Sequence, residues 1–190
     1  MKITRRRFVA LGATAALAVG LTACGGSDST TGSSGSGAGG LKIGIKIDQP
    51  GPGLKQGSDY TGMDIDVARY VAGKLGTAAD KITWVPAPSA QRETLIETGQ
   101  VDLVVGTYSI TDARKQKVSF AGPYFIAGQD LLVRADEASI TGPESMTGKK
   151  LCSVKGSTSA QKVKDKYPGV NLQEFGTYSE CVAALVSKGV

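Results

Sequence analysis

The chain has 190 residues, with 22 lysines and arginines against 17 aspartates and glutamates, and it has no histidine. Four of the basic side chains lie in the first 23 residues, so the rest of the chain is nearly neutral and loses the main support for a nucleic-acid partner. Without histidine, Ser-His-Asp and Cys-His catalysis are excluded, and three cysteines give no usual zinc site. We expect no metal and no other cofactor.

Residues 1–23 have the form of an export signal. A basic stretch that ends at Arg7 precedes the uncharged run Phe8–Leu21, which is too short for a permanent membrane span. Leu21-Thr22-Ala23-Cys24 matches a bacterial lipobox, so we expect cleavage before Cys24, lipidation of this cysteine, and anchoring at the outer face of the cytoplasmic membrane. The arginines fit both the twin-arginine and the general export route. The alternative, that Cys24 is an ordinary residue of a signal peptide, stays open.

The folded part is expected to begin at residue 41, after a tether. Residues 24–40 contain only Gly, Ser, Thr, Ala and one Asp after the cysteine, so they have nothing to bury and should be flexible. Strands are predicted at 41–47, 81–85 and 101–105, and helices at 67–75 and 89–98. Strands that alternate with helices predict a first α/β lobe, residues 41–132, with a parallel sheet covered on both faces.

A long strand is predicted at 126–133, after which the pattern repeats. Strands are predicted at 151–154 and 170–175, and helices behind capping boxes at Thr158–Gln161 and Thr177–Glu180. These elements predict a second α/β lobe over residues 133–190. Its sheet lacks the strand that should follow the last helix, so we expect this lobe to be incomplete and the chain to be a fragment of a longer one.

The cysteines predict a crosslink in the second lobe. Lipidation of Cys24 would leave Cys152 and Cys181 as a pair in an oxidising compartment. A disulfide between them is the expected outcome, and it would stabilise the fold by roughly 3 to 4 kcal/mol in the chain-entropy model. Two unpaired buried thiols are the alternative.

Three segments combine a predicted helix N-terminus with hydroxyl or basic side chains, which suits a small anion. They are Ser89 with Arg92, the loop 106–114 with Arg114, and Gly156–Ser159. The alternatives are that Ser89 and Thr158 only cap helices and that the two arginines are solvated surface charges. Because the same arrangement occurs in both lobes, we expect two walls of one cleft and a ligand with two anionic groups.

Three motifs resemble the polar amino-acid-binding proteins of ABC importers, which are extracytoplasmic solute-binding proteins of family 3. Tyr60–Ala68 is similar to the family's Gly-Phe-Asp-Val-Asp segment, Ser109–Arg114 to its Ser/Thr-Ile-Thr-x-x-Arg loop, and Val118–Tyr124 to its Phe-Ser-x-Pro-Tyr. Segments 44–51, 88–94 and 151–154 further resemble the glutamate-binding lipoproteins of Gram-positive importers. The resemblance implies a periplasmic-binding-protein-like α/β fold, with two lobes around a ligand cleft and the second lobe truncated.

The resemblance also implies how the α-carboxylate of an amino acid would be held. In the family this is done by the arginine of the Thr-x-x-Arg loop, which corresponds to Arg114. Ser109 and the backbone at Thr107 would assist it, and Ser157 and Thr158 would add N–H and hydroxyl donors from the second lobe.

An acidic ligand is implied by a second group of residues. Members that prefer such ligands carry a Ser-x-x-Arg that matches Ser89 and Arg92, and Lys46 stands where they carry a further basic residue. The usual carboxylate for the ligand ammonium would lie beyond Val190. The implied protein is a lipid-anchored, monomeric, non-catalytic receptor that delivers L-glutamate or aspartate to the permease of an ABC importer.

Two other functions stay open at this point. An enzyme on the same fold, such as a dehydratase, would need a general acid, for which Asp48 and Asp112 are the nearby candidates. A structural surface lipoprotein would bind no ligand, and the paired serines and arginines of the predicted site argue against it.

Overall fold

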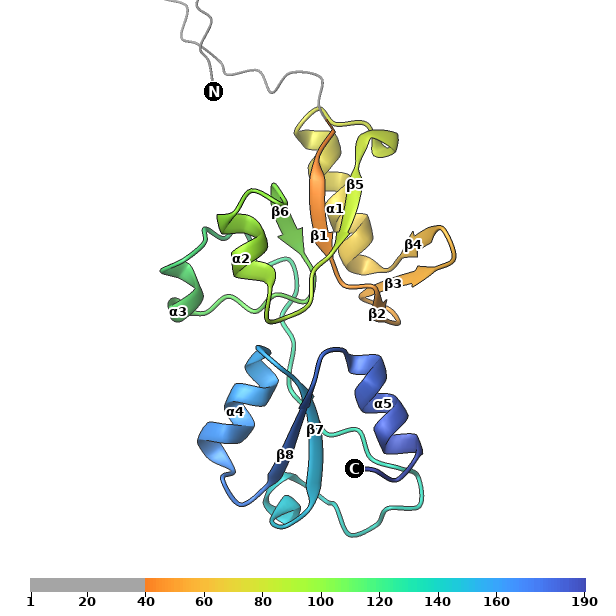
Figure 1. The fold of residues 1–190 in the computed structure, drawn as a ribbon, viewed down its shortest axis with the longest axis vertical. Coiled ribbons are helices and arrows are strands. Elements are labelled where there is room, and N and C mark those ends of the chain that lie inside the picture. Colours follow the sequence, from red (N-terminus) through yellow and green to blue (C-terminus); the bar gives the residue numbers. More distant parts are fainter. Residues whose placement is uncertain (1–39) are drawn as a thin grey trace, which may run out of the picture. The chain divides into compact units, whose positions relative to one another are not determined.

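The computed structural model describes residues 40–190. The predicted export signal, Cys24 and the predicted tether up to residue 39 lie outside the described residues. The described part contains two α/β units, drawn from orange to green and from cyan to blue in Figure 1. None of the helices in this part is long and apolar enough to cross a membrane.

The first unit is built on a parallel sheet of three strands, as the sequence predicts. β1 (Lys42–Ile45) lies between β5 (Thr83–Pro86) and β6 (Leu103–Val105) (Figure 1). Both pairings are parallel, and Ile43 is in register with Trp84 on one side and Leu103 on the other. The carboxyl ends of the three strands therefore meet at one edge, which is where open α/β sheets bind ligands.

Helices pack on this sheet because its strands are apolar on both faces. The helices of the first unit are α1 (Met63–Lys74), the 3-10 turn η1 (Ala79–Lys81), α2 (Arg92–Glu97) and α3 (Asp112–Lys115). Ile43 and Ile45 are fully buried and share a cluster with α1, whereas Leu95 of α2 belongs to a second cluster. A Cβ on Gly44 would lie 2.8 Å from a side-chain carbon of β6, so glycine permits this close packing.

A small antiparallel sheet follows β1 that the sequence patterns do not predict. It consists of β2 (Asp48–Gln49), β3 (Gly53–Gln56) and β4 (Asp59–Thr61), in the order β2-β3-β4. The proline- and glycine-rich stretch that indicates only a break is the turn between β2 and β3, where Gly51 has φ 93°. Strands of two to four residues are too short to show an alternating pattern.

The second unit repeats the order of strand and helix that the sequence predicts. Its elements are the 3-10 turn η2 (Pro143–Met146), β7 (Lys150–Val154), α4 (Thr158–Lys166), β8 (Asn171–Phe175) and α5 (Tyr178–Val186). β7 and β8 pair in parallel. A disulfide joins Cys152 of β7 to Cys181 of α5, with the two Cα atoms 5.5 Å apart, which confirms the predicted pairing.

The two helices of this unit begin differently. The capping box of α5 is confirmed, because Thr177 Oγ1 accepts from the Glu180 N–H at 3.3 Å and the Glu180 carboxylate accepts from the Thr177 N–H at 2.8 Å. The capping box predicted at Thr158 is wrong. Ser157 caps α4, since its Oγ accepts from the Ala160 N–H at 3.0 Å, and the Thr158 hydroxyl is left for other contacts.

The long strand predicted at 126–133 is also wrong. This segment has no regular secondary structure in the described chain, and Ile126 and Leu132 are 87% and 72% exposed. Its apolar composition suits a strand, but neither parallel sheet of residues 40–190 includes it as a partner. A strand needs a neighbour for its backbone hydrogen bonds, and composition alone does not reveal whether one is present.

Candidate functional site

A polar cavity of about 190 Å³ lies where most of the predicted binding residues meet. It is lined by residues from both α/β units, namely Gln49, Ser89, Arg92, Thr107, Ser109, Ala127, Gly128, Gln129, Ser157, Thr158, Ser159, Lys162 and Tyr178. Two predicted residues, Lys46 and Arg114, are not among the lining residues but contact residues that are. The structure therefore brings all eight predicted ligand-binding residues into one neighbourhood.

Arg92 is the buried cation of this cavity. It is the first residue of α2 and only 2% exposed, so it is not the solvated charge that the sequence left open. Its guanidinium donates to the carbonyls of Ser89 at 3.4 Å, Gly106 at 3.1 Å and Thr107 at 3.4 Å. Burial, and then the charge of Arg114, lowers the pKa of Arg92 to about 10.

Lys46 is a second buried cation close by. It follows the end of β1, is 4% exposed, and its Nζ donates to Ser89 Oγ at 2.8 Å. Burial, and then the charge of Arg92, lowers its pKa to about 8 against the opposing effect of Asp48. The sequence suggested that Ser89 caps α2, and this is wrong. The N-cap is Gln91, which makes no side-chain cap hydrogen bond.

Arg114 differs from these cations because a carboxylate neutralises it. Its Nε lies 3.2 Å from Glu93 Oε1, and its two terminal nitrogens donate to the Ser109 and Gly156 carbonyls, each at 2.9 Å. The side chain is only 11% exposed, which excludes a solvated surface charge. Arg114 lies on α3. The N-cap of this helix is Thr111, whose Oγ1 accepts from the Arg114 N–H at 3.3 Å.

A buried aspartate binds the backbone of the loop after β6. Thr107 has φ 46°, a conformation that is uncommon for a residue with a branched side chain. Its N–H donates to Asp64 at 2.8 Å, and Tyr124 donates its hydroxyl to the same carboxylate at 2.7 Å. Asp64 is fully buried, and burial raises its pKa although both hydrogen bonds oppose the rise. These contacts fix the backbone that faces the cavity.

Hydrogen bonds also join the two units beside the cavity. The hydroxyls of Ser109 and Thr158 are 3.0 Å apart. Asp48 accepts from the N–H groups of Tyr178 and Ser179 at 2.8 and 3.1 Å, and from the Ser179 hydroxyl at 3.2 Å. Asp48 of the first unit thus accepts hydrogen bonds from the N-terminal turn of α5 in the second unit. Residues from the N-terminal turns of α4 and α5 also line the cavity.

Neither predicted general-acid candidate lines the cavity. Asp48 is engaged by α5, and Asp112 lies at the surface, where Lys115 Nζ is 3.1 Å from its carboxylate. The arrangement can bind anions through buried guanidinium, ammonium and N–H groups, and it offers no carboxylic acid directed at a ligand among the residues that line it.

Several supporting residues were missed in the sequence analysis. They are Gln49, Asp64, Glu93, Tyr108 and Tyr178. Asp64 lies inside a motif that resembles the family, and Tyr108 lies next to another. An acid next to the apolar residues of a predicted helix could have indicated that Asp64 has a role in the site. The others depend on contacts between segments distant in sequence.

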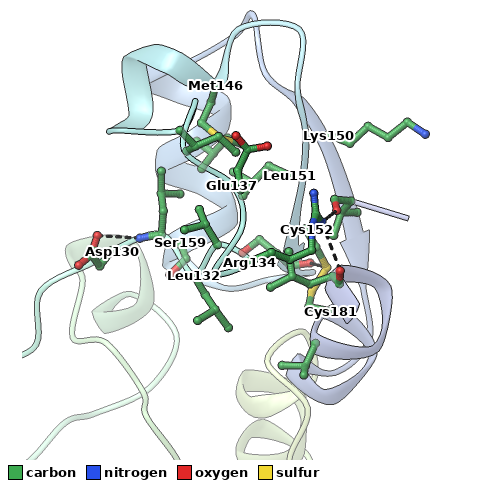
Figure 2. A pocket seen from close by; sticks show the side chains of 18 of the residues that line it. Asp130, Leu132, Arg134, Glu137, Met146, Lys150, Leu151, Cys152, Ser159 and Cys181 are labelled. Atoms are coloured by element: carbon green, nitrogen blue, oxygen red, sulfur yellow. Dashed lines mark hydrogen bonds between the residues drawn. A yellow bond between two sulfur atoms is a disulfide. The ribbon is translucent and has the colours of Figure 1, made fainter. Parts of the chain in front are cut away.

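A different cavity, of about 240 Å³, lies in the second unit beside the disulfide (Figure 2). Its wall is mainly apolar, with Leu132, Met146 and Leu151 among its lining residues. Arg134 crosses it to donate to the carbonyl of Val190 at 2.7 Å. Arg134 also donates to the carbonyl of Leu185 at 3.3 Å, and no predicted ligand-binding residue lines this cavity.

Comparison with known proteins places these observations in a family. Residues 41–189 match the model of the bacterial extracellular solute-binding proteins, family 3. The chain is 50% identical over 186 residues to the glutamate-binding protein GluB of Corynebacterium glutamicum, an alignment that covers 92% of this chain. It is 37% identical over 147 residues, 76% of this chain, to a glutamine-binding protein of Geobacillus stearothermophilus.

A solved structure has a similar fold. An ancestral arginine-binding protein bound to glutamine is 34% identical, with a TM-score of 0.74, and the match covers 79% of this chain and 66% of that one. The chain spans 62% of the length of the Corynebacterium glutamicum protein and 56% of the Geobacillus stearothermophilus protein. The family match over residues 41–189 includes both α/β units and every residue that lines the polar cavity.

Proposed function

Because the chain belongs to the bacterial extracellular solute-binding proteins of family 3, we propose that it captures an acidic amino acid for an ABC importer. The ligand that we propose is L-glutamate or L-aspartate. The relatives named above carry glutamate, glutamine or arginine in their names, so membership alone does not select an acidic ligand, and the selection has to come from the site.

The observation that carries the proposal is a pair of buried cations with no carboxylate within ion-pair distance in residues 40–190, although the charges of Asp48 and Glu93 act on them from farther away. Arg92 and Lys46 are 2% and 4% exposed, and the ion pairs of residues 40–190 include neither of them. A buried charge is costly unless it is paired. A ligand carboxylate in the cavity would pair with both cations, whereas a cationic side chain would be repelled and a neutral amide would leave them uncompensated.

The rest of the site suits the other end of an amino acid. We propose that Arg114 and Ser109 bind the α-carboxylate, with the backbone at Thr107, while Ser157 and Thr158 donate from the start of α4. Arg114 already has Glu93 as a partner, so it adds a hydrogen-bonding site without adding net charge. Charge selection therefore rests on Arg92 and Lys46, and α-carboxylate recognition on Arg114.

We further propose that the receptor is monomeric, non-catalytic and lipid-anchored. The family is extracellular, and lipidation of Cys24 would hold the protein at the outer face of the cytoplasmic membrane, where it would deliver its ligand to the permease. Mass spectrometry of the membrane-bound protein tests the anchor, because an unmodified N-terminal peptide would reject it.

Calorimetric titration of the full-length protein with L-glutamate, L-aspartate, L-glutamine and L-arginine tests the ligand class. We expect binding of at least one acidic amino acid to be at least about tenfold tighter than binding of glutamine, since an unpaired buried charge costs well over 1 kcal/mol. Equal affinity for glutamate and glutamine, or a preference for arginine, would contradict the proposal.

A further inference from the structure

One aromatic ring contacts both arginines of the site. The guanidinium carbon of Arg92 lies over the ring of Tyr108, 4.1 Å from its centre, and that of Arg114 lies 4.8 Å from the same centre. Phe120 supports the ring edge-on, with the two ring centres 5.0 Å apart. The two guanidinium carbons can be no farther apart than these two distances added together, so Tyr108 limits their separation.

The ring, and not the hydroxyl, makes these contacts. The hydroxyl of Tyr108 is buried and has no hydrogen-bond partner within residues 40–190. The side chain makes two cation–π contacts and packs against Phe120. Its hydroxyl lies near the Glu93 carboxylate without meeting hydrogen-bond geometry, and burial, followed by this carboxylate, raises the pKa of Tyr108. Removing the hydroxyl should therefore change little, whereas removing the aromatic face should change the position of the cations.

An aromatic side chain at position 108 offsets the repulsion between the two arginines. Arg92 and Arg114 repel one another, since the charge of Arg114 contributes to lowering the pKa of Arg92. Glu93 offsets this for Arg114, but Arg92 donates only to three backbone carbonyls. The negative face of an aromatic ring attracts both guanidinium groups, and this attraction is strongest when the groups are desolvated. Tyr108 can thus hold two like charges at a short, defined separation.

We propose that Tyr108 is a positioning residue that fixes Arg92 relative to Arg114 and thereby selects the length of the acidic ligand. This inference rests on the proposed function, in which the two arginines bind the two carboxylates of one amino acid. Glutamate and aspartate carry the same charges at different separations, so a fixed spacing of the arginines discriminates between them. Tyr108 does not line the cavity and acts through the arginines.

The test compares Tyr108→Phe with Tyr108→Leu in the full-length protein, by calorimetry with L-glutamate, L-aspartate and L-glutamine. Tyr108→Phe keeps the ring and should leave all three affinities within about twofold of the wild type. Tyr108→Leu should weaken the preferred acidic ligand about tenfold and glutamine by less than about threefold. The ratio of glutamate to aspartate affinity should move toward one in Tyr108→Leu only.

Each outcome decides between a specific and a general role. An equal loss for all three ligands in Tyr108→Leu would show a merely structural role and overturn the inference, as would Tyr108→Phe behaving like Tyr108→Leu. If circular dichroism shows that Tyr108→Leu does not fold, Tyr108→Met takes its place with the same expectations. A wild-type protein that binds none of these amino acids would instead contradict the proposed function.

Discussion

The two α/β units supply the cavity with different chemistry. The first unit contributes buried side-chain cations, of which Arg92 is 2% and Lys46 is 4% exposed. The second contributes hydroxyls, the N-terminal turns of α4 and α5, and one exposed lysine, Lys162. Under the proposed function, we expect the buried cations of the first unit to select the ligand and the second unit to add affinity that depends less on the ligand's charge.

Arg114→Ala is expected to have the largest effect, because every amino acid has an α-carboxylate. Loss of a guanidinium that replaces the hydration of a carboxylate should cost roughly 2 to 5 kcal/mol, and binding of glutamate, aspartate and glutamine should all become too weak to measure by calorimetry. Lys115→Ala is the matched control, since Lys115 lies on the same short helix with an exposed side chain. If Arg114→Ala still binds glutamine, Arg114 does not bind the α-carboxylate.

Arg92→Met should weaken glutamate binding more than glutamine binding, which separates recognition of the side-chain charge from recognition of any amino acid. We expect glutamate to lose about 2 to 3 kcal/mol of binding free energy, because the variant lacks one partner of its side-chain carboxylate. Glutamine has no such carboxylate and should lose much less. The measurement is the ratio of the two dissociation constants, and an unchanged ratio would mean that Arg92 does not contact the side chain of the ligand.

Lys46 should make glutamate binding depend on pH above about 8. Its pKa in the ligand-free protein is about 8, below the ordinary value of 10.5, so the folded protein loses this proton at a lower pH than the unfolded chain. The free energy of unfolding of the ligand-free protein should therefore rise between about pH 8 and pH 10. Over the same interval glutamate affinity should fall, by at most about tenfold per pH unit.

The control for this prediction is Lys46→Met, measured over the same pH series. The α-amino group of free glutamate titrates equally in both experiments, so the ratio of wild-type to variant affinity isolates the lysine. A ratio that stays constant from pH 7 to pH 10 would show that Lys46 does not contribute a charge to binding.

Asp48→Ala should have the smallest effect and should test the contribution of the second unit. The substitution removes three hydrogen bonds to the N-terminus of α5, which should weaken the contact between the two units by about 1 kcal/mol. The lost contacts to α5 should weaken glutamate, aspartate and glutamine alike. Because the Asp48 carboxylate also competes with the ligand for the charge of Lys46, the acidic ligands should lose less than glutamine. Asp59→Ala, at an exposed position of β4, is the control. A loss confined to glutamate would show that Asp48 belongs to the selective part of the site.

The fold was predictable where local patterns were long and regular. The parallel sheet, both pairs of covering helices and the capping box at Thr177 follow from periodicity and from known cap chemistry. The antiparallel strands β2 to β4 are too short for a pattern, and the apolar stretch 126–133 has the composition of a strand without a partner strand. Local patterns do not report which segments pair in space.

The site was predictable to the extent that its residues belong to motifs. The spacing of Ser89 and Arg92 predicts that the two residues lie close together, and both line the cavity, but it also predicts a cap at Ser89 that the structure does not have. Contacts across longer separations were not predictable in this way: Lys46 reaches Ser89 over 43 positions, Glu93 pairs with Arg114 over 21, and Asp48 reaches Tyr178 over 130. The tertiary fold creates these contacts, and they determine which cation is paired with a carboxylate.

Under the proposed function, Lys46 and Arg92 also set the range of external pH in which an acidic ligand can be bound. The pKa of Lys46 is about 8 and that of Arg92 about 10, and the chain contains no histidine. The side-chain carboxyl of free glutamate has a pKa of about 4.3, so it stays ionised down to roughly pH 5. Between pH 5 and pH 7 neither this carboxylate nor either cation changes its charge. The proposed charge pairing of this site would therefore stay intact when the medium acidifies from pH 7 to about pH 5.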